Sequence, residues 1–439
     1  TNLKSDLSIE KYSANGKYVF ANGKPITIEG IAGNKVKISL SGSDYVELPE
    51  SDNLIVFGGS KDKSVSSSSV TMKSGIVTRL YGGGYGTTKD NSANVNGTSI
   101  LTVTGGTVKT SAFGGGKYYA HSQNVEINIS GENTFIGDPK ETGNYWLICG
   151  GDENGKTSGS NYVEFDQSNN TVESATLNIN GGTYSLIALG GTDGAKGYIK
   201  NVTADIKNAT ITGGIYGNGS NGRSDEVVGT LTNCTFAKSN SPIEIAAVNR
   251  GKSKNISLTF DNCTFPTQAS DIYAYLGATY NTLLGYQGSE YGVPESVNFV
   301  FKGTKAFPEV GVSDGLGSAN VTLTGAKGYI KPFVASSSST IKAFTIPEGK
   351  TWAFNNGLEI ANDVTLTKTG TLAVKGTLTL SKVDQLAMAL SSVTSGGTID
   401  LSSVTATNML TALNNGEKKA LTAGICILCS DVTVYTDMA

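Results

Sequence analysis

The sequence predicts an all-β solenoid, because one unit of strand and turn recurs along most of the chain. Segments such as LTVTGG, TLNING, ADIKNA and TLTNC alternate apolar and polar residues, as a half-buried strand does, and then reach a small residue. The spacing between successive small residues is near 30, with two long insertions, which is typical of repeats that bury their apolar faces by stacking. These small residues are Gly42, Gly75, Gly105, Gly131, Gly181, Ala209, Cys234, Cys263, Gly303 and Gly325.

A second set of positions keeps the same register. At a fixed distance after each small residue, an apolar run ends and is followed by glycine or another small residue. Strands stacked about 4.8 Å apart over about ten such turns, or rungs, would form a rod on the order of 50 Å long. The residues that close the runs are Phe57, Tyr81, Phe113, Cys149, Leu189, Tyr216, Ala246 and Leu276.

These alternating strands and glycine corners resemble the right-handed parallel β-helix family, the fold of pectate-lyase-like enzymes and of many bacterial surface proteins. The resemblance covers residues 36–335 and implies a right-handed parallel β-helix of about ten rungs with small terminal caps. Residues 1–35 contain two Asn-Gly turns and are expected to form an N-terminal hairpin cap. Residues 336–380 read as short strands, similar to the tails of bacterial cell-surface adhesins, and 381–439 are expected to form a C-terminal α/β cap.

Composition and charge limit the classes of binding partner that this chain is expected to have. The formal net charge is −3, the pI is near 5.5, and no stripe of Lys and Arg interleaved with aromatic residues occurs, so nucleic acid is an improbable partner. No run of about 18 apolar residues is present, so we expect no transmembrane segment. The chain begins at Thr1, which fits removal of a signal peptide or a trimmed sequence. We expect an extracellular or cell-surface monomer without a cofactor.

The five cysteines, an odd number, do not suggest a disulfide framework. Cys234 and Cys263 occupy equivalent places in TNCTF and DNCTF, so both are predicted to be buried thiols on adjacent rungs. Cys426 and Cys429 form a CxxC pair within a predicted strand, which places the two sulfurs on opposite faces. A zinc site would need a second pair, so these are also interpreted as buried thiols.

Three asparagines precede the small residue in register and predict a ladder of stacked amides, although each also begins an N-x-Thr sequon. They are Asn208, Asn233 and Asn262. Near the C-terminus, residues 381–392 carry apolar residues at helical spacing behind a Ser-x-x-Asp cap, which predicts a short helix. A second short helix is expected at 408–414.

The two long insertions, near 137–171 and 279–295, carry aromatic residues in polar surroundings. Insertions in solenoids collect on the surface and often form the binding face. One hypothesis places the acidic and basic residues that follow the glycine positions on the same edge, and solvated loop charge is the structural alternative. These residues are Asp152, Glu153, Asp193, Arg223, Asp225, Glu226 and Arg250. The predicted ligand-binding residues are Tyr118, Tyr145, Trp146, Asp152, Glu153, Tyr162, Asp193, Asp225, Arg250, Tyr280 and Tyr286.

Three functions remain open at this stage. The favoured one is an adhesin-like protein that binds glycans or host surface ligands through its loops. The alternative is a polysaccharide lyase or glycoside hydrolase, which would require Asp193, Asp225 and Arg250 to meet in one groove. A purely structural spacer is the third. His121 is the only histidine, is expected to be exposed in a polar loop, and gives no support to a Ser-His-Asp triad.

Overall fold

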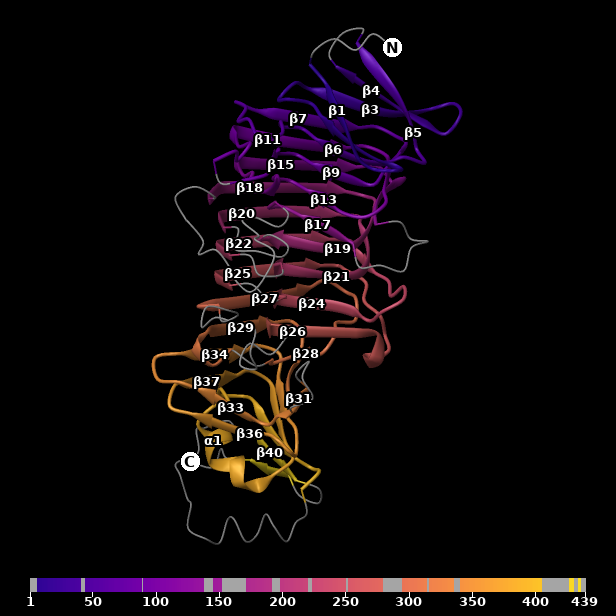
Figure 1. Cartoon of the computed structure of the whole chain (residues 1–439). Helices are drawn as coiled ribbons and strands as arrows, with labels where there is room; N and C mark the ends of the chain where they lie inside the picture. The colour runs from indigo at the N-terminus through magenta and orange to yellow at the C-terminus, as the bar shows by residue number, and fades with distance from the viewer. Residues whose placement is uncertain are drawn as a thin grey trace.

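The computed structural model describes residues 6–40, 44–88, 90–137, 145–151, 171–191, 198–219, 223–249, 252–278, 294–313, 316–334, 340–404, 426–429 and 433–435. The molecule is all-β and elongated, with long parallel sheets that run along its length, an arrangement consistent with a β-solenoid (Figure 1). Within these ranges, no helix has the length and apolar character needed to cross a membrane.

One sheet, called sheet B here, contains 14 strands. In sheet order from β3 to β37 each strand pairs parallel with its neighbour, and apart from a bulge in β11 between Val95 and Thr98 the residues keep register, so that Leu101 lies between Val70 and Ile127. The strands are β3 (Ile26–Ile31), β4 (Lys35–Leu40), β5 (Tyr45–Pro49), β7 (Ser68–Met72), β11 (Val95–Val103), β15 (Ser122–Ser130), β18 (Thr171–Asn180), β20 (Tyr198–Lys207), β22 (Arg223–Thr232), β25 (Lys252–Asp261), β27 (Ser296–Lys302), β29 (Asn320–Thr324), β34 (Thr351–Phe354) and β37 (Thr371–Val374).

The second sheet, sheet A, contains 21 strands, several of them short. They are β1 (Ser8–Ser13), β2 (Gly16–Phe20), β6 (Asn53–Phe57), β8 (Ile76–Val77), β9 (Arg79–Tyr81), β12 (Gly106–Val108), β13 (Ala112–Phe113), β16 (Thr134–Ile136), β17 (Trp146–Ile148), β19 (Thr183–Gly190), β21 (Thr210–Asn218), β23 (Thr235–Phe236), β24 (Ile243–Val248), β26 (Ile272–Ala278), β28 (Val310–Gly311), β30 (Gly328–Ile330), β35 (Leu358–Ile360), β38 (Thr377–Leu380), β39 (Thr398–Leu401), β40 (Cys426–Cys429) and β41 (Thr433–Tyr435).

Three small two-stranded sheets and short helices complete the described structure. The sheets pair β10 (Tyr85–Gly86) with β14 (Lys117–Tyr118), β31 (Phe333–Val334) with β32 (Thr340–Ile341), and β33 (Ala343–Ile346) with β36 (Thr365–Lys368). The helices are α1 (Leu386–Leu390) and the 3-10 turns η1 (Ala269–Asp271), η2 (Leu316–Ser318) and η3 (Val383–Gln385).

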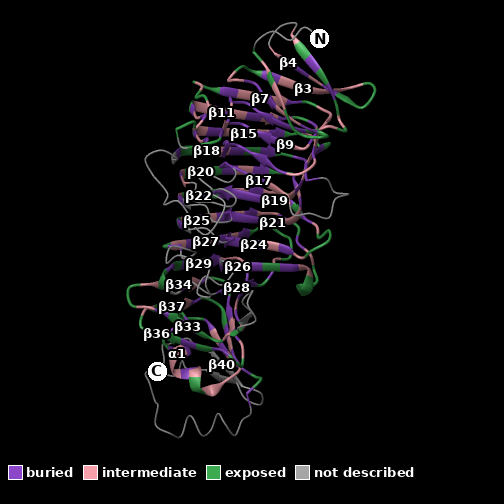
Figure 2. Ribbon diagram, viewed as in Figure 1, coloured by how far each residue is buried: buried purple, intermediate pink, exposed green. Residues whose placement is uncertain are grey.

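The main hydrophobic core lies between the two sheets. Side chains alternate between the faces of a strand, and the inward ones form one continuous cluster that includes Val56 of sheet A and Leu101 of sheet B. Figure 2 shows the buried residues as a purple band through successive strands. At Gly114 the sheets approach so closely that a Cβ would lie 2.3 Å from Val125 Cγ1, so this position requires glycine.

The turns after six consecutive strands of sheet B, from β15 to β27, each use a residue with positive φ at the same position. Gly131, Gly181, Asn208, Asn233, Asn262 and Gly303 occupy equivalent positions, with φ between 54° and 106°. The predicted alignment is therefore wrong by one residue at Ala209, Cys234 and Cys263, which follow the asparagines. The physical reason is that Gly and Asn tolerate the left-handed conformation, so asparagine is the counterpart of glycine here.

The predicted buried thiols are confirmed, and the predicted amide ladder is confirmed for Asn233 with Asn262, whereas Asn208 bonds to Asn180, outside the predicted set. The side chain of Asn208 donates to Asn180 Oδ1 at 2.8 Å, and that of Asn262 donates to Asn233 Oδ1 at 2.8 Å. Cys234 and Cys263 are both free and fully buried. The predicted strand around Cys426 is present as β40, but its side chains lie outside the described residues.

The two ends of the molecule differ in part from prediction. The sequence predicts a first rung at Val36, whereas β4, which contains it, pairs antiparallel with β3 and β5. The first parallel pairs are β2 with β6 and β3 with β7. At the other end, the predicted helix is present as η3 and α1, but without the Ser-x-x-Asp cap, because no side chain caps either segment. The second predicted helix, 408–414, lies outside the described residues.

Candidate ligand-binding face

The outer face of sheet A carries a second apolar layer. Val56 belongs to the main core, so its neighbour Phe57 points to the opposite side of β6. There the rings of Phe20, Phe57, Tyr81 and Phe113 stack on successive strands, with centroids 4.6–5.0 Å apart. Adjacent rings thus cover one another and leave no space between them.

A cluster of tyrosines covers the N-terminal end of this layer. Tyr12 stacks on Tyr18 at 4.4 Å, Tyr18 lies 5.5 Å from Tyr85, and Tyr85 lies 5.4 Å from Tyr118. Tyr12 is 38 % exposed, and the other three are partly buried. We call these four residues the N-terminal tyrosine cluster.

The middle of the face is formed by Trp146 and Tyr216, whose rings lie 5.3 Å apart. Trp146 packs against both the N-terminal apolar layer and a second outer cluster made by Leu186, Tyr216 and Ala246. The hydroxyl of Tyr216 donates a hydrogen bond to the Glu244 carboxylate. The apolar face is therefore continuous from one end to the other.

The C-terminal part of the face is hollowed. Tyr273 and Tyr275 project from β26, with centroids 6.4 Å apart, and Tyr329 projects from β30. The strand between them, β28, contributes Gly311, which has no side chain to fill the gap. We call this hollow the C-terminal tyrosine hollow, and it is lined by Ile272, Tyr273, Ala274, Tyr275, Glu309, Gly311, Tyr329 and Lys331.

Charged groups border the hollow. Lys331 Nζ lies 5.3 Å from the centroid of the Tyr329 ring. Lys327 Nζ forms an ion pair with Glu359 and lies 4.0 Å from a Glu309 carboxylate oxygen. The hollow therefore offers aromatic faces together with carboxylate and ammonium groups.

Tyr275 and Tyr329 in the hollow remain neutral phenols near neutral pH. Burial raises the pKa of Tyr275 to about 12, and the Glu244 carboxylate acts in the same direction. Burial also raises the pKa of Tyr329, and the carboxylates of Glu359 and Glu309 add to the effect. Each hydroxyl can thus both donate and accept a hydrogen bond.

Of the predicted binding residues, four lie in the described structure. Trp146 and Tyr118 belong to the outer aromatic face, and Tyr145 is partly buried just before β17, where its backbone N–H points to Ser185 Oγ at 3.5 Å. The other predicted residues, Asp152, Glu153, Tyr162, Asp193, Arg250, Tyr280 and Tyr286, lie outside the described residues.

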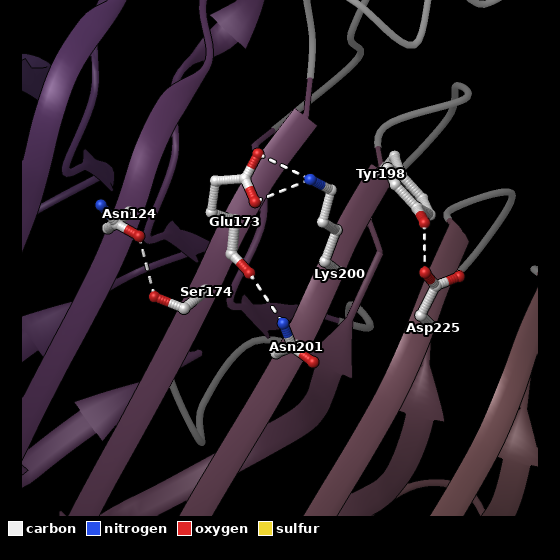
Figure 3. A network of polar contacts seen from close by, with 7 residues as sticks. All are labelled: Asn124, Glu173, Ser174, Tyr198, Lys200, Asn201 and Asp225. Atoms are coloured by element: carbon white, nitrogen blue, oxygen red, sulfur yellow. Dashed lines mark hydrogen bonds and ion pairs between the residues drawn. The ribbon is translucent and has the colours of Figure 1, made fainter.

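Asp225, the fourth, lies on β22 in sheet B rather than beside the aromatic residues of sheet A. It accepts a hydrogen bond from the Tyr198 hydroxyl at 2.5 Å and pairs with Lys254 Nζ at 2.9 Å. Figure 3 shows this contact beside the ion pair of Glu173 with Lys200 on the preceding strands. Such alternation of charge across paired strands stabilises a sheet, so Asp225 has a structural role in this network.

His121 differs from its predicted exposed environment. The side chain is partly buried, and Nδ1 has no hydrogen-bond partner within the described structure. Burial lowers the pKa of His121 to about 4, so it is neutral near pH 7.

The residues that sequence reasoning missed are Tyr273, Tyr275 and Tyr329. The segment IYAYL reads as a strand that is apolar on both faces, with Ala274 inward and the two tyrosines outward. A strand that is apolar on both faces indicates that its outer face is covered or functional. This pattern can be read from the sequence. The sequence placed Tyr216 at the end of an apolar run, but only the structure shows that its side chain points outward.

Among the described residues, no three His, Cys, Asp or Glu side chains lie close enough together to hold a metal ion. Comparison of the chain with protein-family models, with curated proteins and with solved structures gives no match.

Proposed function

We propose that this chain is an adhesin-like binding protein of the cell surface or extracellular space, which holds a glycan non-covalently on the outer face of sheet A. The observation that carries the proposal is the C-terminal tyrosine hollow, where three tyrosines surround a gap left by Gly311. The insertions remain part of the proposal, since Trp146 of the insertion 137–171 lies on β17 in this face.

Sugar rings fit this chemistry. The C–H bonds on one face of a pyranose pack against the electron-rich face of an aromatic ring, and tyrosine also supplies a hydroxyl for orientation. Tyr273 is 38 % exposed, so its ring is open to a ligand. Glu309 and Lys331 are exposed at the border and supply an acceptor and a donor for sugar hydroxyls.

One observation favours hydrolysis as a second candidate. Glu244 pairs with Tyr273 on one side, and the pairing of Val310 with Ala274 places Glu309 on the other side. Two strand spacings separate these carboxylate-bearing residues, which gives about 9.6 Å between their Cα atoms. Inverting glycosidases likewise use two carboxyl groups that flank the scissile bond. Binding without turnover remains the proposal because Glu244 is hydrogen-bonded to Tyr216.

Affinity electrophoresis tests the proposal. The protein is run through native gels that contain a soluble β-glucan, a galactomannan or polygalacturonate, with and without calcium. We expect retardation by at least one polymer, and at least about tenfold weaker retention after Tyr273→Ala. Tyr45→Ala is the matched control, because Tyr45 is 45 % exposed on β5, which belongs to sheet B and not to the proposed binding face.

Two results would contradict the proposal. The first is migration unaffected by every polymer, or equal retention of the wild type and the Tyr273→Ala variant. The second is the release of new reducing ends or unsaturated products. If new reducing ends form without unsaturated products and disappear in Glu309→Gln, the chain is a hydrolase, whereas unsaturated products would make it a lyase.

The proposed fold is more specific than the architecture described above. We propose a monomeric right-handed parallel β-helix of the pectate-lyase-like superfamily with about ten rungs. Its handedness follows the general preference of parallel crossover connections in sheets. The parallel register of sheet B and the glycine corners support it.

A further inference from the structure

The register of two neighbouring rungs places Cys234 and Cys263 side by side. Two residues before them, Thr232 pairs with Asp261 in the parallel ladder of sheet B. Immediately after them, the Thr264 N–H donates to the Cys234 carbonyl oxygen at 2.8 Å. Paired positions on parallel strands lie about 4.8 Å apart, and a disulfide spans Cα atoms separated by about 4.4–6.8 Å. The backbone spacing at this pair therefore suits a disulfide.

The two side chains point in the same direction and their thiols are in contact. Both belong to the main hydrophobic core and are fully buried. Cys263 Sγ lies 3.5 Å from the carbonyl oxygen of Leu231, a residue on the rung of Cys234, and the two thiols form a hydrogen bond with one another. An S–S bond thus needs only a small approach of two sulfur atoms that already meet.

No other described cysteine has a cysteine as its neighbour in the stack. The position that matches Cys234 on the preceding rung is Ala209, because Lys207 pairs with Thr232 two residues earlier. Cys149 follows β17, and the register of β17 with β19 places Leu189 beside it. Among the described residues, the pair of Cys234 with Cys263 is therefore the one place where adjacent rungs can be joined covalently.

We propose that Cys234 and Cys263 form a cross-linking site, where a disulfide joins two adjacent rungs when the chain folds in the presence of a low-molecular-weight disulfide. The thiolate of one cysteine attacks a sulfur of the oxidant, which forms a mixed disulfide and releases one small thiol. The thiolate of the other cysteine then attacks the protein sulfur of the mixed disulfide and releases the second small thiol. Two protein thiols and one small disulfide thus become one protein disulfide and two small thiols.

Burial decides when this reaction can occur. Both thiols are inaccessible once the core has formed, so the exchange takes place before the two rungs close on one another. For the same reason, the finished disulfide is shielded from external thiols. The inference is independent of glycan binding.

The cross-link would join the two rungs that lead to β24 and β26, which pair parallel in sheet A. Of these strands, β26 carries Tyr273 and Tyr275 of the C-terminal tyrosine hollow. The bond closes a loop of roughly 30 residues in the unfolded chain and so reduces the conformational entropy gained on unfolding. The oxidised protein should therefore unfold at a higher temperature than the reduced protein.

The test is refolding of the full chain from denaturant in a mixture of oxidised and reduced glutathione, followed by alkylation and tryptic mapping without reduction. Lys238 and Arg250 lie between the two cysteines, so trypsin places them in separate peptides. We expect one disulfide-linked pair of peptides that contains Cys234 and Cys263 and that separates on reduction. The thermal midpoint of the oxidised protein should be a few degrees above that of protein refolded with a reductant.

Two variants serve as matched controls. Cys263→Ala should give neither the linked peptides nor the rise in midpoint, whereas Cys149→Ala should retain both, because it removes a buried thiol elsewhere in the core. Mapping of the wild type decides the cross-link even if a variant fails to fold. Absence of the linked pair, or a disulfide between other cysteines in its place, would overturn the proposal. A linked pair with unchanged midpoints would overturn its stabilising role.

Discussion

The edge of the Tyr275 ring lies over Gly311: Cδ1 and Cε1 are 3.2 Å and 3.4 Å from the point that a Cβ at Gly311 would occupy. On the N-terminal strands of the same face, equivalent positions carry Phe57, Tyr81 and Phe113, whose stacked rings fill the space. Glycine at this position leaves a gap beside the Tyr275 ring and opens the hollow between Tyr275 and Tyr329.

Filling that gap should impair binding. In Gly311→Val the branched side chain would meet the Tyr275 ring and displace it, so polysaccharide affinity should fall at least about tenfold. Overpacking should also lower the free energy of unfolding by about 1–3 kcal/mol. Affinity electrophoresis and thermal melts of Gly311→Val and Gly311→Ala measure both effects, and the alanine should have the smaller ones. Wild-type affinity in a folded valine variant would show that the hollow is not the binding site.

Turn positions should be far less tolerant than the exposed segment before β7. Gly181 has φ of 94°, so Gly181→Val forces a branched residue into a strained conformation at a cost of about 1–3 kcal/mol. Ser66 is exposed, so Ser66→Val should change the unfolding free energy by less than about 0.5 kcal/mol. Thermal midpoints compare them, and equal midpoints would refute the turn assignment. Ser68 is not a valid control, because it is buried and its Oγ donates to the Gly82 carbonyl at 2.6 Å.

The sequence predicted most of the solenoid because its constraints are local and repeated. Strand alternation, turn residues and the asparagine ladder each recur about once per rung, and Cys234 and Cys263 lie where the repeat places them. The turn alignment was off by one residue because a count of small side chains cannot show that Asn208 and Gly181 share a positive φ.

The candidate site was harder to predict because it depends on direction rather than residue type. The sequence predicted the insertions as the binding face because they carry aromatic residues, yet Tyr273 and Tyr275 belong to a regular strand. Their outward direction follows from the inward direction of Ala274, and that is decided by which face of β26 meets sheet B. Gly311 matters only because the Tyr275 ring on the neighbouring strand lies beside it, and this contact cannot be read from the sequence.

The stacked thiols should react slowly and be sensitive to substitution. The hydrogen bond with Cys234, together with burial, raises the pKa of the Cys263 thiol, so little thiolate is present near neutral pH. Cys263→Ala should cost about 1–3 kcal/mol of stability through lost packing, and Cys263→Ser more, because the hydroxyl is harder to satisfy. Thiol labelling in the native and unfolded states checks this, and rapid native labelling of both cysteines would count against it.

His121 should make stability depend on pH. Its folded pKa of about 4 lies below the ordinary value of 6.5, so the unfolded chain binds more protons between these values. Stability is therefore fully present above about pH 6.5 and falls as the pH drops toward 4, by about 1–3 kcal/mol. Denaturant titrations of the wild type and His121→Gln measure the difference. The same loss in both proteins would assign it to other groups.

Calorimetric titration of a short oligosaccharide, prepared from the retained polymer, into the wild type and Tyr329→Ala tests the central claim most directly. Glycan binding in the C-terminal tyrosine hollow predicts that Tyr329→Ala weakens binding at least about tenfold, with the fold unchanged by circular dichroism. An identical isotherm for the two proteins would contradict the claim.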